Sequence, residues 1–153
     1  MSENKGRYNL WLKQALYDLR MAKLAQENGF FEWTCFCAEQ SAEKSLKAYL
    51  LFKDWKIPHL HRLSVLFRIC QRIDPEFKKL RLPFQALENF TFISRYPYAI
   101  PEENRSPHNF IKEEESRLCL RESEKILETI KRLVETESPA QNQQSSDFKN
   151  KAF

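Results

Sequence analysis

Apolar residues recur at intervals of three and four along most of the chain, which is the spacing of amphipathic helices. In the first segment these positions are Leu12, Leu16, Leu19 and Ala22. Gly29 follows this segment, at a place where a glycine in the left-handed conformation typically ends a helix. A second segment runs from about Phe31 to Lys53, and its apolar positions are Cys35, Ala38, Ala42, Leu46, Tyr49 and Leu50.

Three further segments show the same period. One covers residues 60–73, after Pro58, and the next starts at Pro75 and continues to Phe90, with Pro83 as a kink or break. The last covers residues 111–134 and begins with three glutamates, which suit the positive end of a helix dipole. The pattern predicts an all-α fold, an up-and-down bundle of four long helices plus a shorter fifth.

Two stretches lack this period. Between residues 95 and 110 three prolines, Pro97, Pro101 and Pro107, predict a long loop without regular structure. After Thr136 the chain is polar, so residues 136–153 are predicted to be a disordered tail that follows a helical domain of residues 1–135.

Composition narrows the class of protein further. With two glycines in 153 residues, the chain has too few glycines for a P-loop or a dinucleotide-binding fingerprint. The net charge of +4 comes from 25 basic and 21 acidic residues of interspersed sign, which argues against sequence-specific DNA binding. No membrane-length apolar run and no leading signal segment occur, and the four cysteines form no CxxC pair, so we expect a cytoplasmic protein with reduced thiols.

A polar stripe on the second helix is the first candidate site. Gln40, Glu43, Lys44 and Lys47 recur at intervals of three and four. They form either a solvated face with a Glu43–Lys47 ion pair or a surface on which two ammonium groups bind an anion. The frequency of charged helix faces favours the first interpretation by about two to one.

The second candidate is Ser94-Arg95-Tyr96-Pro97, at a helix end before the proline-rich loop. A guanidinium binds phosphate in bidentate fashion, and a tyrosine ring offers a face to a nucleobase. The alternative is that Arg95 caps helix carbonyls and Tyr96 packs on the bundle, and the sequence does not separate the two.

Catalytic and metal-binding motifs are not apparent. His59 and His61 lie two residues apart, which places them on different faces of a helix and argues against shared metal binding. No nucleophile has a recognisable Ser/His/Asp setting, and we expect no catalytic residue, no metal and no cofactor.

Taken together, these features resemble the HEPN family, over roughly residues 8–135. The most specific part of the resemblance is the Gln40-x-x-Glu43-Lys44-x-x-Lys47-Ala48 helix joined to Arg95-Tyr96-Pro97 about fifty residues later. The resemblance implies a helical bundle that usually dimerises, binds nucleotides or RNA, and often has a minimal nucleotidyltransferase as a neighbour or partner. The resemblance also implies that the candidate nucleotide-binding residues are Gln40, Glu43, Lys44, Lys47, Arg95 and Tyr96.

The chain departs from the family in one respect. Many HEPN proteins resemble metal-independent ribonucleases in which a histidine follows an arginine after four to six residues, and no arginine here has a histidine at that spacing. Arg105 and His108 have only two residues between them, in the predicted loop. The chain therefore resembles the non-catalytic branch that carries Arg-Tyr-Pro.

Three hypotheses follow. The leading one is a non-catalytic dimer whose Lys44, Lys47 and Arg95 bind the phosphates of an ATP-like nucleotide while Tyr96 contacts the base. The second is a ribonuclease toxin of a toxin–antitoxin pair, with a displaced active site that uses Arg95 or Arg105 with His108. The third is a purely structural interaction protein, whose interface would use the abundant aromatic residues Phe30, Phe31, Trp33, Phe36 and Phe92.

Overall fold

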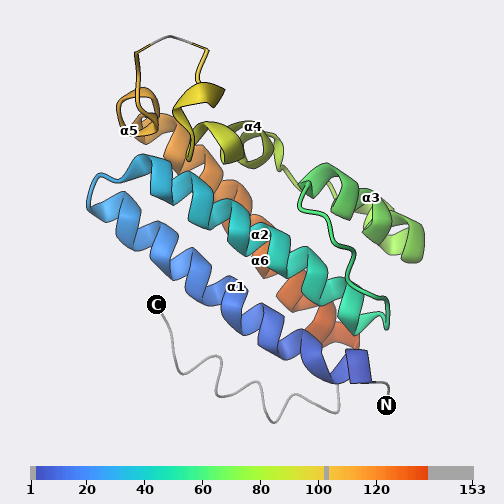
Figure 1. Cartoon of the computed structure of the whole chain (residues 1–153). Helices are drawn as coiled ribbons and strands as arrows, with labels where there is room; N and C mark the ends of the chain where they lie inside the picture. The colour runs from blue at the N-terminus through green and yellow to red at the C-terminus, as the bar shows by residue number, and fades with distance from the viewer. Residues whose placement is uncertain (1–2, 102–103, 138–153) are drawn as a thin grey trace.

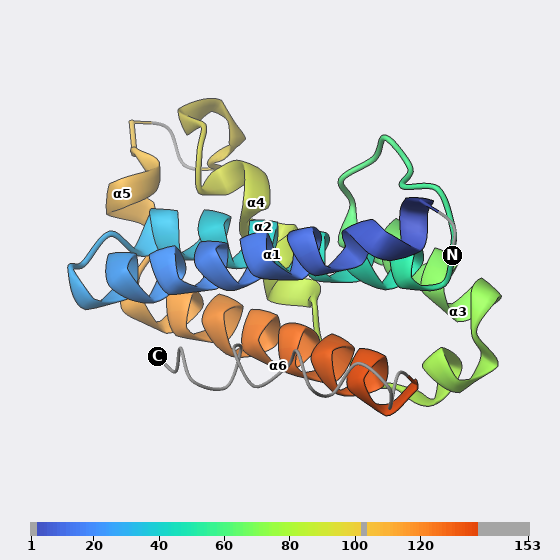
Figure 2. The ribbon, with the colours of Figure 1, turned by 90° about the horizontal axis from the view of Figure 1, so that it is seen from below.

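Three long helices form the framework of the molecule. The computed structural model describes residues 3–101 and 104–137. Helices α1 (Glu3–Glu27), α2 (Phe31–Phe52) and α6 (Glu113–Glu137) have 25, 22 and 25 residues and run side by side (Figures 1 and 2). No strand occurs in the described residues, so the expected all-α, up-and-down bundle is confirmed.

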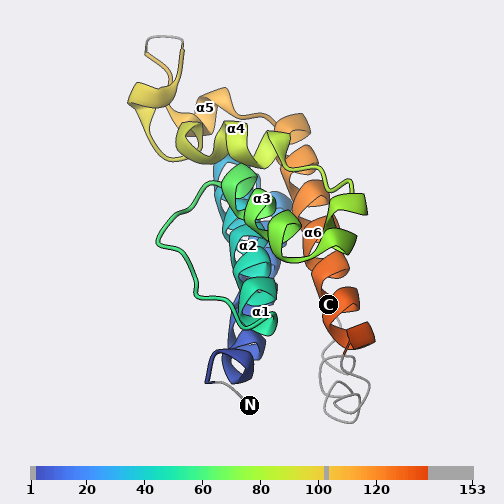
Figure 3. The same cartoon turned by 90° about the vertical axis from the view of Figure 1, so that its right-hand side faces the viewer.

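The remaining helices are short. Helices α3 (Leu63–Ile73) and α4 (Gln85–Ile93) pack across α2 on the side away from α1, where α4 also contacts α6 (Figure 3). Between them lies the 3₁₀ turn η1 (Pro75–Lys79), so the predicted fourth helix is broken before Pro83. After α4 come the 3₁₀ turn η2 (Pro97–Ala99) and the single-turn helix α5 (Pro107–Phe110).

Helix α2 is the centre of the bundle, and sixteen of its 22 residues are buried. Alanines allow α1 and α2 to approach closely, since Ala15, Ala22, Ala38 and Ala42 are all 0% exposed. Two serine hydroxyls tie the long helices together: Ser41 donates to the Ala15 carbonyl at 2.7 Å, and Ser123 donates to the Ala38 carbonyl at 2.6 Å.

The turn between α1 and α2 follows the prediction. Gly29 has φ +79°, in the left-handed region where a side chain would be strained. The backbone N–H of Phe30 donates to the Ala25 carbonyl at 2.9 Å, and that of Gly29 donates to the Gln26 carbonyl at 3.3 Å. These two bonds occupy carbonyls that the end of α1 would otherwise leave without partners.

The stretch between residues 95 and 110 differs from the prediction, because η2 and α5 lie within it. Each begins at a proline, whose fixed φ suits the first position of a helix. The prolines therefore start short helical turns here and do not only interrupt regular structure. Ser106 also caps α5, since its hydroxyl accepts a hydrogen bond from the backbone N–H of Asn109 at 3.2 Å.

At the C-terminus, α6 continues to Glu137, two residues into the predicted tail. The rest of that tail, residues 138–153, lies outside the described residues. The four cysteines are free thiols: Cys35, Cys70 and Cys119 are buried, and Cys37 is half-buried. None of the helices in the described part of the chain is long and apolar enough to cross a membrane.

The two glycines make a matched test of backbone conformation. Neither would bring an added Cβ within 4 Å of another group, so only φ distinguishes them. Gly29→Ala should lower the free energy of unfolding by about 1 kcal/mol. Gly6→Ala, inside α1, should raise it by about 0.5 kcal/mol. Urea unfolding followed by circular dichroism measures both, and changes of the same sign would contradict the assignment.

Candidate functional site

Helix α4 is held in place by a carboxylate from α6. Its N-cap residue, Phe84, offers no side-chain hydrogen bond, but Glu122 accepts from the backbone N–H groups of Ala86 at 3.2 Å and Leu87 at 3.0 Å. Glu122 is only 6% exposed, and negative charge is favourable at a helix N-terminus. This contact helps to fix the helix whose other end carries Arg95.

Arg95 follows directly on the C-terminal end of α4 and packs against aromatic rings. Its Nε donates to the Thr91 carbonyl at 3.0 Å, which is the helix-capping contact considered from the sequence. Its guanidinium carbon lies 4.8 Å from the ring centroid of Phe36, 5.4 Å from that of Phe92 and 5.1 Å from that of Tyr96. Within the described residues Arg95 forms no ion pair, so its positive charge is available to a ligand.

Tyr96 and Tyr98 form an aromatic surface beside this guanidinium. Their rings are stacked, with centroids 5.3 Å apart and an interplanar angle of 17°. Tyr98 is 80% exposed, and the Phe92 ring lies 6.5 Å from that of Tyr96. Exposed, stacked rings of this kind are suited to contact with a nucleobase.

His108 on α5 is oriented by a carboxylate from the first turn of α2. Its Nδ1 lies 3.0 Å from both carboxylate oxygens of Glu32, whose side chain is 9% exposed. The expectation of an extended loop around His108 is therefore wrong, because α5 and the Glu32 contact hold this side chain. A carboxylate on one ring nitrogen leaves the other nitrogen to act as an acid or base.

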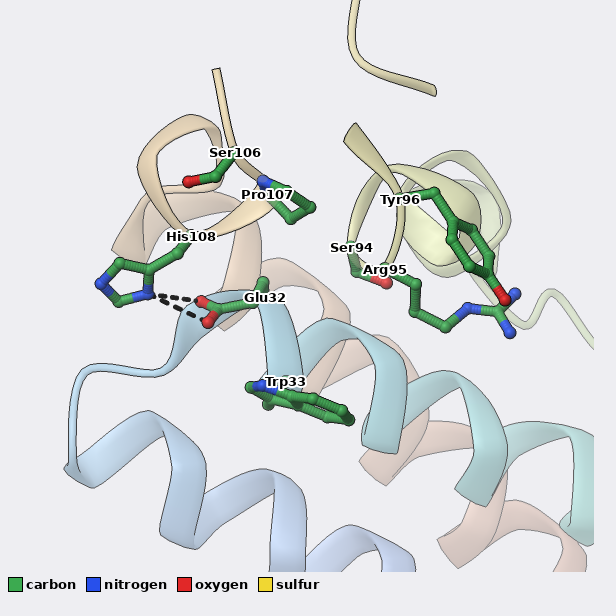
Figure 4. A pocket seen from close by; sticks show the side chains of 8 residues that line it. All are labelled: Glu32, Trp33, Ser94, Arg95, Tyr96, Ser106, Pro107 and His108. Carbon is green, nitrogen blue, oxygen red and sulfur yellow. Dashed lines mark hydrogen bonds and ion pairs between the residues drawn. The ribbon is translucent and has the colours of Figure 1, made fainter. Parts of the chain in front are cut away.

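These elements enclose a pocket of about 430 Å³. Its lining residues are Glu32, Trp33, Ser94, Arg95, Tyr96, Ser106, Pro107 and His108. Figure 4 shows Arg95 and Tyr96 on one side and His108 with Glu32 on the other, with Trp33 between them on α2. The guanidinium and the imidazole point away from each other, so they do not converge on one point.

Two of the polar residues predicted on α2 form a hydrogen-bonded chain outside the pocket lining. Lys44 Nζ lies 2.7 Å from Oδ2 of Asp18 on α1 and donates to Gln40 Oε1 at 3.2 Å. Gln40 Nε2 in turn donates to Glu39 Oε2 at 2.9 Å. Lys44 and Gln40 are thus connected to Glu39, and Glu39 is buried with 3% exposure.

The other two, Glu43 and Lys47, form a buried ion pair. Lys47 Nζ lies 2.7 Å from Glu43 Oε1, and the two side chains are 5% and 7% exposed. His61 Nδ1 is 2.9 Å from the same oxygen, while Glu43 Oε2 is buried without a hydrogen-bond partner in the described residues. The expected Glu43–Lys47 pair is confirmed, but it faces the protein interior instead of solvent.

Glu39 has the most perturbed carboxyl group near the pocket. Burial is the largest cause and, together with the like charge of Glu43, raises its pKa to about 7. The hydrogen bond from Gln40 and the positive charges of Arg95 and Lys44 act in the opposite direction, lowering the pKa. Near neutral pH, this buried group is therefore present in both charged and neutral forms.

The structure brings only part of the predicted set together. Arg95 and Tyr96 line the pocket, whereas Gln40, Glu43, Lys44 and Lys47 do not. The pocket lining also includes Trp33, Glu32 and His108, from segments that the spacing arguments did not connect. Trp33 could be selected among the surplus aromatic residues and His108 as the histidine of the ribonuclease hypothesis, whereas nothing in the sequence pointed to Glu32.

The groups that the site offers for binding or catalysis are amino-acid side chains. Among the described residues, no group of three or more His, Cys, Asp and Glu side chains is placed to hold a metal ion. Arg95 and Tyr96 lie on one side of an open pocket, and a histidine–glutamate pair lies on the other side. Such an arrangement can bind a phosphate and a base, and it offers one imidazole for proton transfer.

Comparison with known proteins agrees with this fold. The profile of the HEPN domain matches residues 8–133. The chain therefore belongs to the HEPN family, which confirms the resemblance seen in the sequence. The non-catalytic branch within that family is not distinguished by this match.

Individual relatives are similar over most of their length. The chain is 28% identical over 129 residues to "Putative toxin MJ1304" of Methanocaldococcus jannaschii, covering 80% of this chain and 84% of that protein. TT1696 of Thermus thermophilus superposes with a TM-score of 0.70 at 26% identity, covering 82% of this chain and 97% of that one. ST0689, described as an archaeal HEPN homologue, superposes with a TM-score of 0.60 at 26% identity, covering 84% and 98%.

The burial of the two lysines predicts different roles in stability. Lys47→Met leaves the Glu43 carboxylate in the interior without its ammonium partner and should lower the free energy of unfolding by about 3 kcal/mol. Lys44→Met breaks a more exposed pair with Asp18 and should lower it by less than about 1 kcal/mol. Equal effects in urea unfolding would contradict the placement of these two side chains.

Proposed function

We propose that the pocket at the end of α4 binds a nucleotide or a segment of RNA, with Arg95 on a phosphate and Tyr96 on the base. The observation that carries this proposal is that Arg95 lies at an open pocket, between aromatic rings and without an ion-pair partner in the described residues. A guanidinium packed on its faces still has N–H groups on its edge, and these fit the oxygens of a phosphate.

The aromatic residues around the pocket support the base-binding half of the proposal. Tyr96 stacks on Tyr98, and Trp33 is 53% exposed although it lies in the pocket lining. Exposed aromatic rings are unfavourable in water and are common where bases stack. In this proposal Gln40 and Lys44 act on the site indirectly, through Glu39, and the Glu43–Lys47 pair maintains the helix.

The wider role proposed for the protein follows its family. We infer a cytoplasmic homodimer without catalytic activity that acts with a minimal nucleotidyltransferase as its partner protein. One face of α1 supports protein–protein contact, because Leu10, Tyr17, Met21 and Leu24 fall on one side of the helix and are each more than half exposed.

Binding is tested by titration of the full chain with ATP and with a short oligoadenylate in a calorimeter. Arg95→Ala should weaken binding at least tenfold, because a charged hydrogen bond contributes about 1.5–3 kcal/mol. Arg132→Ala, on α6 and exposed, should leave affinity unchanged. Binding should also weaken as salt is raised. No binding by the parent protein at millimolar ligand would overturn the proposal.

A second function, RNA cleavage, is favoured by the contact between His108 and Glu32. A histidine held by a buried carboxylate can take the proton of a ribose 2′-hydroxyl as that oxygen attacks phosphorus. The bond from phosphorus to the 5′-oxygen of the next nucleotide then breaks, this oxygen takes a proton from water, and a 2′,3′-cyclic phosphate remains. The relative named "Putative toxin MJ1304" points in the same direction. Within one chain, however, His108 and Arg95 lie on opposite sides of the pocket, so we rank cleavage second.

RNA cleavage is tested with a labelled single-stranded RNA in the presence of a metal chelator. If His108 is the base, His108→Ala should slow cleavage at least about 100-fold. Glu32→Gln should slow it less, because it removes the group that orients the imidazole and keeps the imidazole itself. Absence of cleavage by the parent protein, or equal cleavage by His108→Ala, would exclude this mechanism while leaving the binding function intact.

A further inference from the structure

Arg95 lies over Phe36, on the side of α2 that also carries Glu39. The Arg95 guanidinium lies 4.8 Å from the ring of Phe36, and Glu39 follows Phe36 by three residues, which places both on neighbouring turns of the same helix face. Glu39 is 3% exposed, so water does not screen it. Arg95 is one of the two cations whose charge favours the ionised form of its carboxyl group.

The other charged neighbours of Glu39 do not satisfy it fully. Glu43, one turn further along α2, repels the ionised carboxylate, and its own Oε2 has no hydrogen-bond partner among the described residues. Lys44 is the second cation, but its ammonium group lies 2.7 Å from Asp18 of α1 and also donates to Gln40. Gln40 contributes a side-chain hydrogen bond to Glu39, at 2.9 Å.

A phosphate on Arg95 changes this balance. The anion neutralises the guanidinium and adds a negative charge close to a buried carboxylate that already has Glu43 beside it. Because like charge and loss of a cation both disfavour ionisation, the Glu39 carboxyl group then takes up a proton. An ionised Glu39 and a bound phosphate are both attracted by the positive charge of Arg95 and repel each other, so ionisation of Glu39 weakens phosphate binding.

We propose that Glu39 is a positioning residue for the phosphate site: without a direct ion pair to Arg95, it places a buried negative charge near the guanidinium and takes up a proton when a phosphate occupies Arg95. This inference rests on the proposed binding function and adds a linkage between ligand and proton. Its consequence is that affinity for a phosphodiester increases as pH falls through neutrality. No residue that touches the ligand has to titrate for this effect.

The test uses an oligoadenylate without terminal phosphates, because its charge is constant around neutral pH. Calorimetric titrations of the full chain near pH 7, in two buffers of different ionisation enthalpy, report the protons taken up on binding. The series includes the unsubstituted chain as a reference for binding, and all its other proteins carry His108→Gln, so that the pocket histidine does not contribute to proton uptake. The His108→Gln parent of this series should take up a fraction of a proton for each oligonucleotide bound. Its affinity should fall about fivefold to tenfold from about pH 6 to about pH 8.5.

Glu39→Gln is the diagnostic variant, because glutamine keeps the shape and the hydrogen-bonding capacity of the side chain but carries no titratable proton. It should bind the oligoadenylate with the same affinity across this pH range and without proton uptake. Glu88→Gln, on α4, is the matched control and should behave as the parent.

The outcomes separate the two proposals. Absence of binding by every protein in the series would overturn the proposed function. Binding with equal proton uptake in the parent and in Glu39→Gln, or with none in the parent, would overturn the proton linkage alone. Loss of binding in a folded Glu39→Gln would also overturn it, since a neutral residue leaves Arg95 available to the ligand.

Discussion

Burial of α2 on most of its surface is the constraint on which the rest of the structure depends. A helix in that position has to give its charged side chains partners, because an isolated charge in the interior costs several kcal/mol. The pairing of Lys47 with Glu43 and the chain from Asp18 through Lys44 and Gln40 to Glu39 meet most of this requirement, although Glu43 Oε2 has no partner in the described residues. What resembles a solvated polar stripe in the sequence is therefore a buried and partly buried network, and the cation in the pocket lining is Arg95, on a neighbouring segment.

The pocket is built at the ends of short elements that rest on this framework. Glu122 of α6 caps α4, α4 presents Arg95 and Tyr96 at its end, and Glu32 of α2 holds His108 on α5. Each contact joins a short segment to a long helix. This arrangement is common in binding sites, where a rigid scaffold positions residues on loops and helix ends. It also explains why the pocket lining draws on three separate parts of the chain.

Much of this fold could be predicted from the sequence, because α1, α2 and α6 repeat their apolar residues with helical period and Gly29 marks the end of α1. Arg95 and Tyr96 could be selected as well, since they precede a proline at a helix end. The contact between Glu32 and His108 could not, because it joins residues 76 positions apart and no spacing rule connects them. The inward orientation of Lys47 was hidden for another reason: a helix that is covered on several sides has no single apolar face to reveal its orientation.

The shortness of α4 and α5 has a consequence for how the molecule loses its structure. Helix α4 has nine residues, of which Ala86 and Leu87 belong to the main core, and α5 has four, of which Phe110 alone packs against that core. Segments of this kind open in local fluctuations at a lower free energy than the global transition requires. The site can therefore come apart while the three long helices remain folded, so a chain with almost full helical content can still lack an organised pocket.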